Sequence, residues 1–245
     1  VTTVREPAPT RDHTEVALRE FGAGVQTGPG WASVQGPARL EARELAVPGD
    51  LSSAAFFLVA AAIVPGSHIV ISGVGLNPTR AALIDFLASM GVQVKILEIG
   101  MRHGEPVGDL LVKGSELRGG VVEGKRTAAL IDEIPVLAVL GACSEEGLLV
   151  KDAAELRVKE TDRIETVADN LRRMGVEVET FEDGFRVSGR QRLQGAVVDS
   201  HGDHRIAMAC AVAALRASGP VAIENAGAAS VSFPEFWDTL AHIRG

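Results

Sequence analysis

Apolar side chains recur at helical spacing in three separate stretches of the chain, and each stretch ends at a glycine. In the clearest one, residues 161–174, five apolar side chains fall on one face of a helix, and Gly175 follows as a stop signal. A short run that alternates apolar and acidic residues, 176–179, comes next and predicts a strand. The same order of helix, glycine and strand is predicted for residues 14–26 and 79–95.

A second type of predicted helix alternates with the first and is rich in alanine. These helices begin at Asp50, Asp132 and Asp203, since an aspartate accepts hydrogen bonds from the free N–H groups of a first helical turn. Equivalent positions lie about 70 to 80 residues apart, which predicts repeated units of two helices and a small mixed sheet, with strands at 67–71 and 148–150. Small alanine side chains let helices approach closely, so we expect these helices to pack inward.

The best hinge signal in the chain is Ala46-Val47-Pro48-Gly49. It predicts a domain boundary, with residues 1–48 on one side and residues 49–245 on the other. The first part holds one predicted helix with flanking strands, which is too little to bury its own apolar face. The chain starts at a strand-like Val1 and not at a methionine, which suggests a cut through a longer protein.

Composition narrows the class of protein. The 245 residues are 46% hydrophobic but only 4% aromatic, which favours closely packed α/β layers. A net charge of −8 argues against a nucleic-acid or membrane-surface binder, and no apolar run reaches the roughly 18 to 20 residues of a membrane span. Cys143 and Cys210 lack metal-ligand spacing, so we expect buried free thiols and a cytoplasmic location.

Charge is most concentrated in residues 156–163, which read Leu-Arg-Val-Lys-Glu-Thr-Asp-Arg. The helical pattern places Lys159, Glu160 and Arg163 at a helix N-terminus, where free N–H groups and the helix dipole favour an anion. A cation at that position opposes the dipole, so Arg163 suggests a bound phosphate or carboxylate. The alternative is a solvated cluster in which these charges pair with one another.

Five motifs together resemble the family of 5-enolpyruvylshikimate-3-phosphate synthases, which act on phosphoenolpyruvate and shikimate 3-phosphate. They are TRDHTE (10–15), PGDLSSA (48–54), LIDEIPVLA (130–138), LRVKETDR (156–163) and GDHRIAM (202–208). The similarity extends over essentially the whole chain. It implies an inside-out α/β barrel of repeated βαβαββ units, with mixed sheets and Ala-rich central helices. By the same resemblance, residues 1–48 are the last repeat unit of the partner domain, and residues 49–245 are most of the other domain, with three units.

The resemblance also implies which groups react. Asp132 corresponds to the carboxylate that holds the shikimate hydroxyls and takes the proton from the attacking one. Glu160 corresponds to the acid that protonates the methylene carbon of phosphoenolpyruvate and later helps to remove that proton. Lys159 would contact shikimate 3-phosphate and act on the charge of both carboxylates. Glu133 would point about 100° away from Asp132 on a helix, so it is not an equivalent.

Substrate-binding residues follow from the same comparison of motifs. Arg163 and Arg205 would clamp the carboxylate and phosphate of phosphoenolpyruvate as planar bidentate donors. Thr10 and Arg11 would grip the phosphate of shikimate 3-phosphate from the partner domain. No required role is implied for the histidines His13, His201 and His204, and residues 77–80 are predicted to form a loop outside the site.

Parts of the family pattern are missing. No cation precedes the pair Phe233-Pro234, where many relatives have a lysine that reaches phosphoenolpyruvate. The family's amino-terminal lysine, its glycine-rich loop and its Ser-Ser-Gln phosphate segment belong upstream of Val1. We therefore expect enolpyruvyl transfer in the shikimate pathway from the longer protein, with the missing N-terminal segment as a partner, and negligible turnover from this fragment alone.

Other interpretations stay open at this point. An enolpyruvyl transferase acting on UDP-N-acetylglucosamine shares the fold and the donor but uses a reactive loop cysteine. An RNA 3′-terminal phosphate cyclase would need a basic face. A non-catalytic fragment would bind substrates without turnover. No metal or organic cofactor is implied, because both carboxylates have roles and no ligand cluster has metal-binding spacing. The expected partners are small-molecule substrates, not nucleic acid or a membrane.

Overall fold

The computed structural model describes residues 1–7 and 10–244. The chain forms two compact units. One consists of Val1–Leu51, Ile71–Ala81 and Ile96–Leu110, and the other of Ser52–Val70, Ala82–Lys95 and Leu111–Gly245. The first unit thus includes two stretches that come after the hinge signal at Pro48, and the division of the chain at residue 48 stays a prediction.

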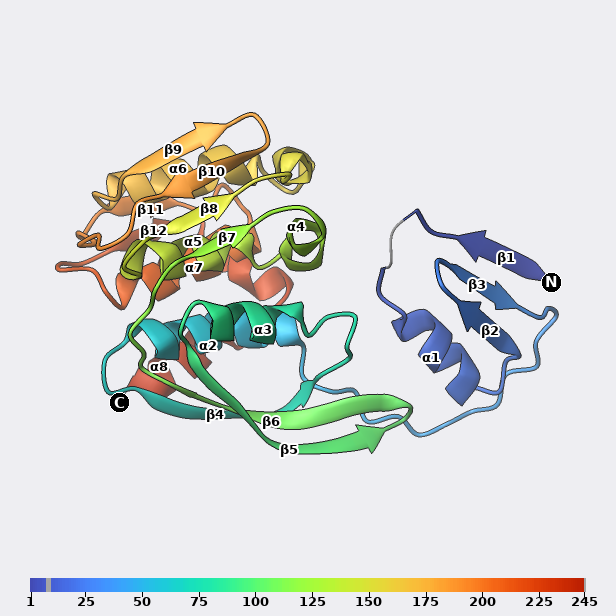
Figure 1. The fold of residues 1–245 in the computed structure, drawn as a ribbon. Coiled ribbons are helices and arrows are strands. Elements are labelled where there is room, and N and C mark those ends of the chain that lie inside the picture. The colour runs from blue at the N-terminus through green and yellow to red at the C-terminus, as the bar shows by residue number, and fades with distance from the viewer. Residues whose placement is uncertain (8–9, 245) are drawn as a thin grey trace. The chain divides into compact units, whose positions relative to one another are not determined.

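A helix and a three-stranded antiparallel sheet form the N-terminal part of the first unit (Figure 1). The strands β1 (Thr2–Arg5), β2 (Val25–Gly28) and β3 (Trp31–Val34) lie in the order β1-β3-β2. Helix α1 (His13–Glu20) contacts β2, yet none of its residues is buried. One helix with flanking strands therefore buries its apolar side chains only in part, as expected for so small a unit.

Three longer strands contribute residues to both units. They are β4 (His68–Gly75), β5 (Gln93–Arg102) and β6 (Glu105–Lys113), in the order β4-β6-β5. Between β4 and β5 lies α3 (Ala82–Ser89), which starts later than predicted. The reason is local, because the side chain of Asn77 accepts hydrogen bonds from the backbone N–H of Thr79 (2.9 Å) and from its hydroxyl (2.7 Å), which holds these residues in a turn.

The described residues of the second unit form two further sheets, of which one is mixed, as the repeats predicted. One has the order β7-β8-β10-β9, with β7 (Gly120–Val122) parallel to β8 (Leu148–Val150), and with β10 (Gly184–Val187) antiparallel to both β8 and β9 (Val178–Phe181). The other is a parallel pair, β11 (Val197–Asp199) and β12 (Ala222–Glu224). The predicted strand at 148–150 is confirmed.

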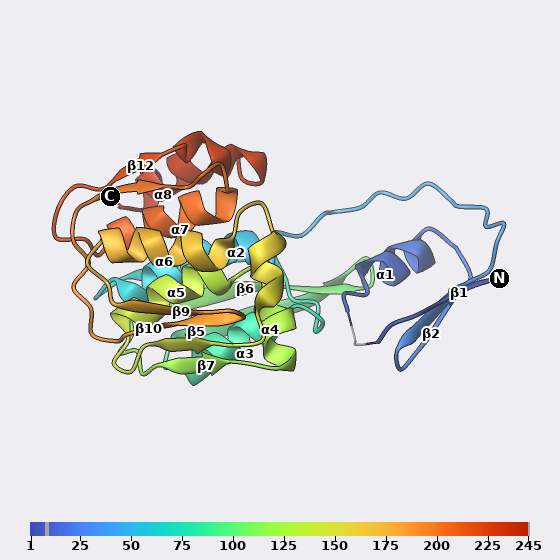
Figure 2. The same ribbon diagram turned by 90° about the horizontal axis from the view of Figure 1, so that it is seen from above.

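Three Ala-rich helices form the core of the second unit, namely α2 (Leu51–Ile63), α5 (Ile134–Cys143) and α7 (His204–Ala214). Every residue of α5 from Ile134 to Ala142 is buried, and α5 packs against α7. Figure 2 shows α6 (Arg163–Arg173) beside both. The prediction that the alanine-rich helices pack inward is confirmed, since small side chains allow close approach.

Shorter helices complete the second unit. They are α4 (Lys125–Leu130), α8 (Phe236–Arg244) and the 3₁₀ helices η1 (Ala154–Val158) and η2 (Ala226–Val231). Aromatic edge contacts join α2 to α8 and to the residues just before it, with ring centroids 6.1 Å apart for Phe56 and Phe236 of α8, and 5.8 Å apart for Phe57 and Phe233. None of the helices among the described residues is long and apolar enough to cross a membrane.

The predicted glycine stops are confirmed. Gly22, Gly91 and Gly175 follow α1, α3 and α6, and their φ angles are +89°, +92° and +80°. Only glycine adopts this left-handed conformation without steric cost, and it turns the chain out of the helix. Two of these helices are shorter than predicted, since α3 runs from Ala82 to Ser89 and not from 79 to 90, and α6 runs from Arg163 to Arg173 and not from 161 to 174. Helix α1 has the predicted eight residues but begins one position earlier, at His13.

Candidate active site

The charged segment before α6 is not the first turn of a helix, which corrects the prediction for Lys159 and Glu160. The 3₁₀ helix η1 ends at Val158, four non-helical residues follow, and α6 begins at Arg163. Asp162 is the N-cap, and its carboxylate accepts a hydrogen bond from the N–H of Glu165 at 3.2 Å. Because the side chain of Asp162 caps α6, Lys159 and Glu160 are not needed for capping and lie outside the helix.

Arg157 holds this segment against the neighbouring hairpin. Its guanidinium donates to the carbonyl oxygens of Phe181 (2.5 Å) and Glu182 (2.6 Å) and to the carboxylate of Asp162 (2.7 Å). The hydrogen bond that Arg157 donates to Asp162 outweighs partial desolvation and raises the pKa of Arg157 above its usual value. The Arg157 guanidinium therefore anchors residues 159–162 against the hairpin.

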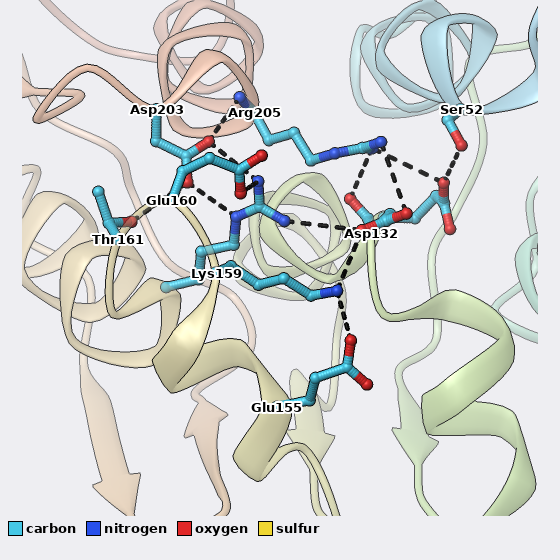
Figure 3. Close-up of polar contacts among 10 residues, drawn as sticks. Ser52, Asp132, Glu155, Lys159, Glu160, Thr161, Asp203 and Arg205 are labelled. Atoms are coloured by element: carbon cyan, nitrogen blue, oxygen red, sulfur yellow. Dashed lines mark hydrogen bonds and ion pairs between the residues drawn. The ribbon is translucent and has the colours of Figure 1, made fainter.

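Arg163 is the most buried cation of the cluster, with 1% of its side chain exposed. It makes a bidentate pair with Asp203, with Nε 2.8 Å from Oδ2 and Nη2 3.2 Å from Oδ1. Nη2 also donates to Glu160 Oε2 at 2.6 Å (Figure 3). The sequence left two interpretations of Arg163, a bound anion or a solvated cluster of paired charges. In the structure Arg163 pairs with charges of the cluster, but its pair with Asp203 is buried and not solvated.

The Asp203 carboxylate accepts hydrogen bonds from three residues. Asp203 is the fully buried N-cap of α7, and its carboxylate accepts from Arg163, from the N–H of Arg205 (2.9 Å) and from the hydroxyl of Thr161 (3.2 Å). Burial raises the pKa of Asp203, but the hydrogen bond and charge of Arg163 and the backbone N–H of Arg205 outweigh it, so the pKa lies below its usual range. The predicted capping role of Asp203 is confirmed.

Asp132 lies where three cations converge. Its carboxylate is 3.7 Å from Nη1 of Arg163, 3.7 Å from Nη2 of Arg205 and 4.0 Å from Nζ of Lys159. Arg205 also donates from Nη1 to the backbone carbonyl of Asp132 at 2.9 Å, and Lys159 pairs with Glu155. One-fifth of the Asp132 side chain remains exposed, so solvent or a ligand can reach it.

The N-cap predicted at Asp132 is wrong by one residue. Asp132 lies in a turn between α4 and α5, and Glu133 is the N-cap of α5, whose first residue is Ile134. Since the backbone at Asp132 is not part of α5, the 100° rotation expected between its side chain and that of Glu133 does not apply. Both carboxylates reach Arg205, because Glu133 Oε1 is 3.8 Å from Nη1.

The second unit thus brings together five of the seven residues proposed for the site, which are Asp132, Lys159, Glu160, Arg163 and Arg205 (Figure 3). Thr10 and Arg11 belong to the first unit, where Thr10 donates to Glu6 through its N–H (3.2 Å) and its hydroxyl (2.5 Å). The roles of Thr10 and Arg11 stay predictions.

Sequence reasoning missed two residues of this cluster. Ser52 lies at the start of α2, and its hydroxyl donates to the carboxylate of Glu133. The helix predicted at Asp132 points the side chain of Glu133 away from the site. The signal for both residues is in the motifs PGDLSSA and LIDEIPVLA, where polar side chains stand at the start of an apolar helical stretch. Among residues 1–7 and 10–244, no group of three or more His, Cys, Asp and Glu side chains is placed to hold a metal ion.

Comparison with known proteins gives consistent matches. The family model for EPSP synthase (3-phosphoshikimate 1-carboxyvinyltransferase) matches residues 1–240. The 3-phosphoshikimate 1-carboxyvinyltransferase of Solibacter usitatus is 60% identical over 242 residues, which are 99% of this chain and 57% of that protein. The protein of the same name from Koribacter versatilis is 54% identical, over 98% of this chain and 56% of its own length.

Solved structures agree with these matches. An EPSP synthase structure from Acinetobacter baumannii has a TM-score of 0.94 and 41% identity, over 99% of this chain and 56% of that one. The enolpyruvyl transferase NikO from Streptomyces tendae, at 20% identity and a TM-score of 0.77, shares the fold. The predicted α/β fold of the enolpyruvyl transferases is confirmed. The chain spans a little over half the length of the relatives it matches.

Proposed function

Because this chain belongs to the EPSP synthase family, we propose that it is the C-terminal portion of a 3-phosphoshikimate 1-carboxyvinyltransferase. The longer protein transfers the enolpyruvyl group of phosphoenolpyruvate to the 5-hydroxyl of shikimate 3-phosphate and releases inorganic phosphate, a step toward aromatic amino acids. The observation that carries this proposal is the cluster in which Asp132 and Glu160 lie among Lys159, Arg163 and Arg205.

The first half of the reaction is an addition. Asp132 accepts the proton of the 5-hydroxyl while that oxygen bonds to C2 of phosphoenolpyruvate, and Glu160 donates a proton to C3, which becomes a methyl carbon. The three cations around Asp132 favour its ionised form, as a base requires. Glu160 is half-exposed, so phosphoenolpyruvate can reach it, and its carboxylate pairs with Nη2 of Arg163 at 2.6 Å.

The second half is the reverse proton movement with a different leaving group. Glu160 removes a proton from the methyl carbon, the C2–O bond to phosphate breaks, and the departing phosphate takes the proton held by Asp132. Both carboxylates return to their starting states, so the cycle balances without a metal or an organic cofactor. Each carboxylate therefore acts once as an acid and once as a base, because the elimination moves both protons in the opposite direction to the addition.

Substrate binding divides among the cations. Arg205, which has 16% of its side chain exposed, and Nη1 of Arg163 would hold the anionic groups of phosphoenolpyruvate. Lys159 would contact shikimate 3-phosphate beside Asp132. Thr10 and Arg11 would grip the phosphate of shikimate 3-phosphate, and the missing N-terminal segment would supply the remaining phosphate contacts.

The test is phosphate release by the longer protein, with this chain alone and the two halves mixed in trans as comparisons. We expect release that requires both phosphoenolpyruvate and shikimate 3-phosphate, and negligible release by this chain alone. Calorimetric titration of the chain with shikimate 3-phosphate, repeated with Arg11→Ala and Asp132→Ala, checks the binding residues. Absence of turnover by the longer protein at saturating substrates contradicts the proposal, and binding without turnover would instead favour a non-catalytic protein.

The two cysteines provide a separate prediction. Burial raises the pKa of Cys143 to about 11, against an opposing effect of Arg216, and burial together with the charge of Asp199 raises the pKa of Cys210 to about 12. Both are free thiols and stay protonated at neutral pH; Cys210 is buried as predicted, whereas Cys143 is only half-buried. We expect iodoacetamide to label them at least about tenfold more slowly in the folded protein than in urea, as judged by mass spectrometry. Fast labelling of either thiol would favour the transferase that uses a reactive cysteine.

A further inference from the structure

Glu133 is a buried carboxylate that the proposed reaction does not use. Its side chain is 7% exposed, and it accepts a hydrogen bond from Ser52, which is itself buried. A buried carboxylate is costly unless a cation and hydrogen-bond donors compensate it. The cation it faces is Arg205, whose Nη1 lies 3.8 Å from Oε1.

Helix capping does not account for Glu133. It occupies the N-cap position of α5, but its side chain makes no capping hydrogen bond there. Glutamate is also a poor N-cap compared with serine, threonine, aspartate or asparagine. The carboxylate is instead turned to the serine hydroxyl and the guanidinium, so its position follows from these two partners and not from the helix start.

Arg205 is held from two sides by groups of different kinds. The carbonyl oxygen of Asp132 and the Glu133 carboxylate face Nη1. The carboxylate of Asp132 faces Nη2 (Figure 3). In the proposed reaction Asp132 gains and loses a proton, so its attraction for Arg205 changes within each cycle. Glu133 has 7% of its side chain exposed and takes no proton in the proposed reaction.

We infer that Glu133, held by Ser52, is a positioning residue that keeps the Arg205 guanidinium in its phosphoenolpyruvate-binding orientation while Asp132 changes charge. This inference rests on the proposed function. A long arginine side chain loses rotational freedom when it binds, and a fixed counter-charge lowers that loss by restraining it beforehand. Ser52 acts on Arg205 only through Glu133, because its hydrogen bond fixes the rotamer of Glu133.

The test compares Glu133→Gln, Arg205→Ala and the double variant in the longer protein. Glutamine keeps the shape and a hydrogen-bond acceptor for Ser52 but removes the charge. We expect Glu133→Gln to raise the KM for phosphoenolpyruvate about tenfold, with kcat and the KM for shikimate 3-phosphate within about twofold. In the Arg205→Ala background the same change should have no further effect, since Glu133 acts through Arg205. Ser52→Ala should act in the same direction, and less.

A matched control is Glu145→Gln, which removes an exposed carboxylate paired with Arg190 and should leave both KM values unchanged. Three results overturn the inference. One is an unchanged KM for phosphoenolpyruvate in Glu133→Gln. Another is a lower KM for phosphoenolpyruvate in Glu133→Gln. That result is expected if the charge of Glu133 only repels the anionic substrate, since its removal would then strengthen binding. The last is a full effect that persists in Arg205→Ala, as expected if Glu133 only stabilises the start of α5.

A second measurement separates this inference from the proposed function. In the chain labelled with ¹⁵N-arginine, the side-chain signals of Arg205 are assigned by their loss in Arg205→Lys. We expect restricted guanidinium rotation in the unmodified chain and faster rotation in Glu133→Gln, without substrate. Unchanged rotation overturns the positioning role whatever the kinetics. If no variant of the longer protein turns over, the proposed function fails, and the rotation measurement still decides whether Glu133 restrains Arg205.

Discussion

Glu160→Gln should reduce turnover of the longer protein by about 10²- to 10⁴-fold, the usual contribution of a positioned acid. Glutamine retains the acceptor oxygen that binds Nη2 of Arg163 at 2.6 Å, so the cluster should stay in place. It has no proton of suitable acidity to give to C3 of phosphoenolpyruvate. The loss should therefore appear in kcat and not in the KM of either substrate.

Isotope exchange sharpens this prediction. When addition reverses in D₂O, a methyl carbon that has rotated returns phosphoenolpyruvate with deuterium at C3. Glu160→Gln should abolish this exchange together with turnover. Glu165→Gln is a matched control, because Glu165 has the same 50% exposure in the same part of the chain but contacts Arg157. More than one-third of wild-type turnover in Glu160→Gln would contradict the assigned role.

Asp203→Asn should destabilise the chain by about 3–5 kcal/mol, the usual cost of removing one partner from a buried ion pair. Arg163 is 1% exposed, and the change leaves its charge without the bidentate partner that compensates its burial. Urea unfolding followed by circular dichroism measures this change in the free energy of unfolding. Asp169→Asn, which breaks the exposed pair with Arg173, should cost less than about 1 kcal/mol.

The pH dependence of stability has a defined sign. The folded-state pKa of Asp203 is lower than its usual value, so its ionised form stabilises the folded state fully above the usual carboxyl pKa of about 3.9. That contribution is lost as the pH falls through the lower, folded-state pKa. Asp203→Asn should therefore show a smaller loss of stability than the wild type between pH 5 and strong acid. Equal acid sensitivity in both proteins would show that other carboxylates dominate.

Local signals in the sequence predicted helix ends correctly where the residue type strongly favours one backbone conformation or one capping role. Gly22, Gly91 and Gly175 end their helices with positive φ angles, and Asp203 caps α7. The prediction for Asp132 was wrong for the opposite reason. An aspartate before an apolar stretch predicts an N-cap, but the structure places a turn there and moves the cap to Glu133, because Asp132 is engaged by Arg205 through its carbonyl oxygen.

Periodicity along the chain predicted the repeated α/β units and the inward Ala-rich helices, and the family resemblance of the motifs predicted five residues that meet in one cluster. How the charges of that cluster pair could not be predicted from the sequence. Arg163 lies 40 positions from Asp203 along the chain, and Ser52 lies 81 positions from Glu133. Such pairs depend on which helix ends meet after packing, and burial then makes each charge depend on its partner for stability.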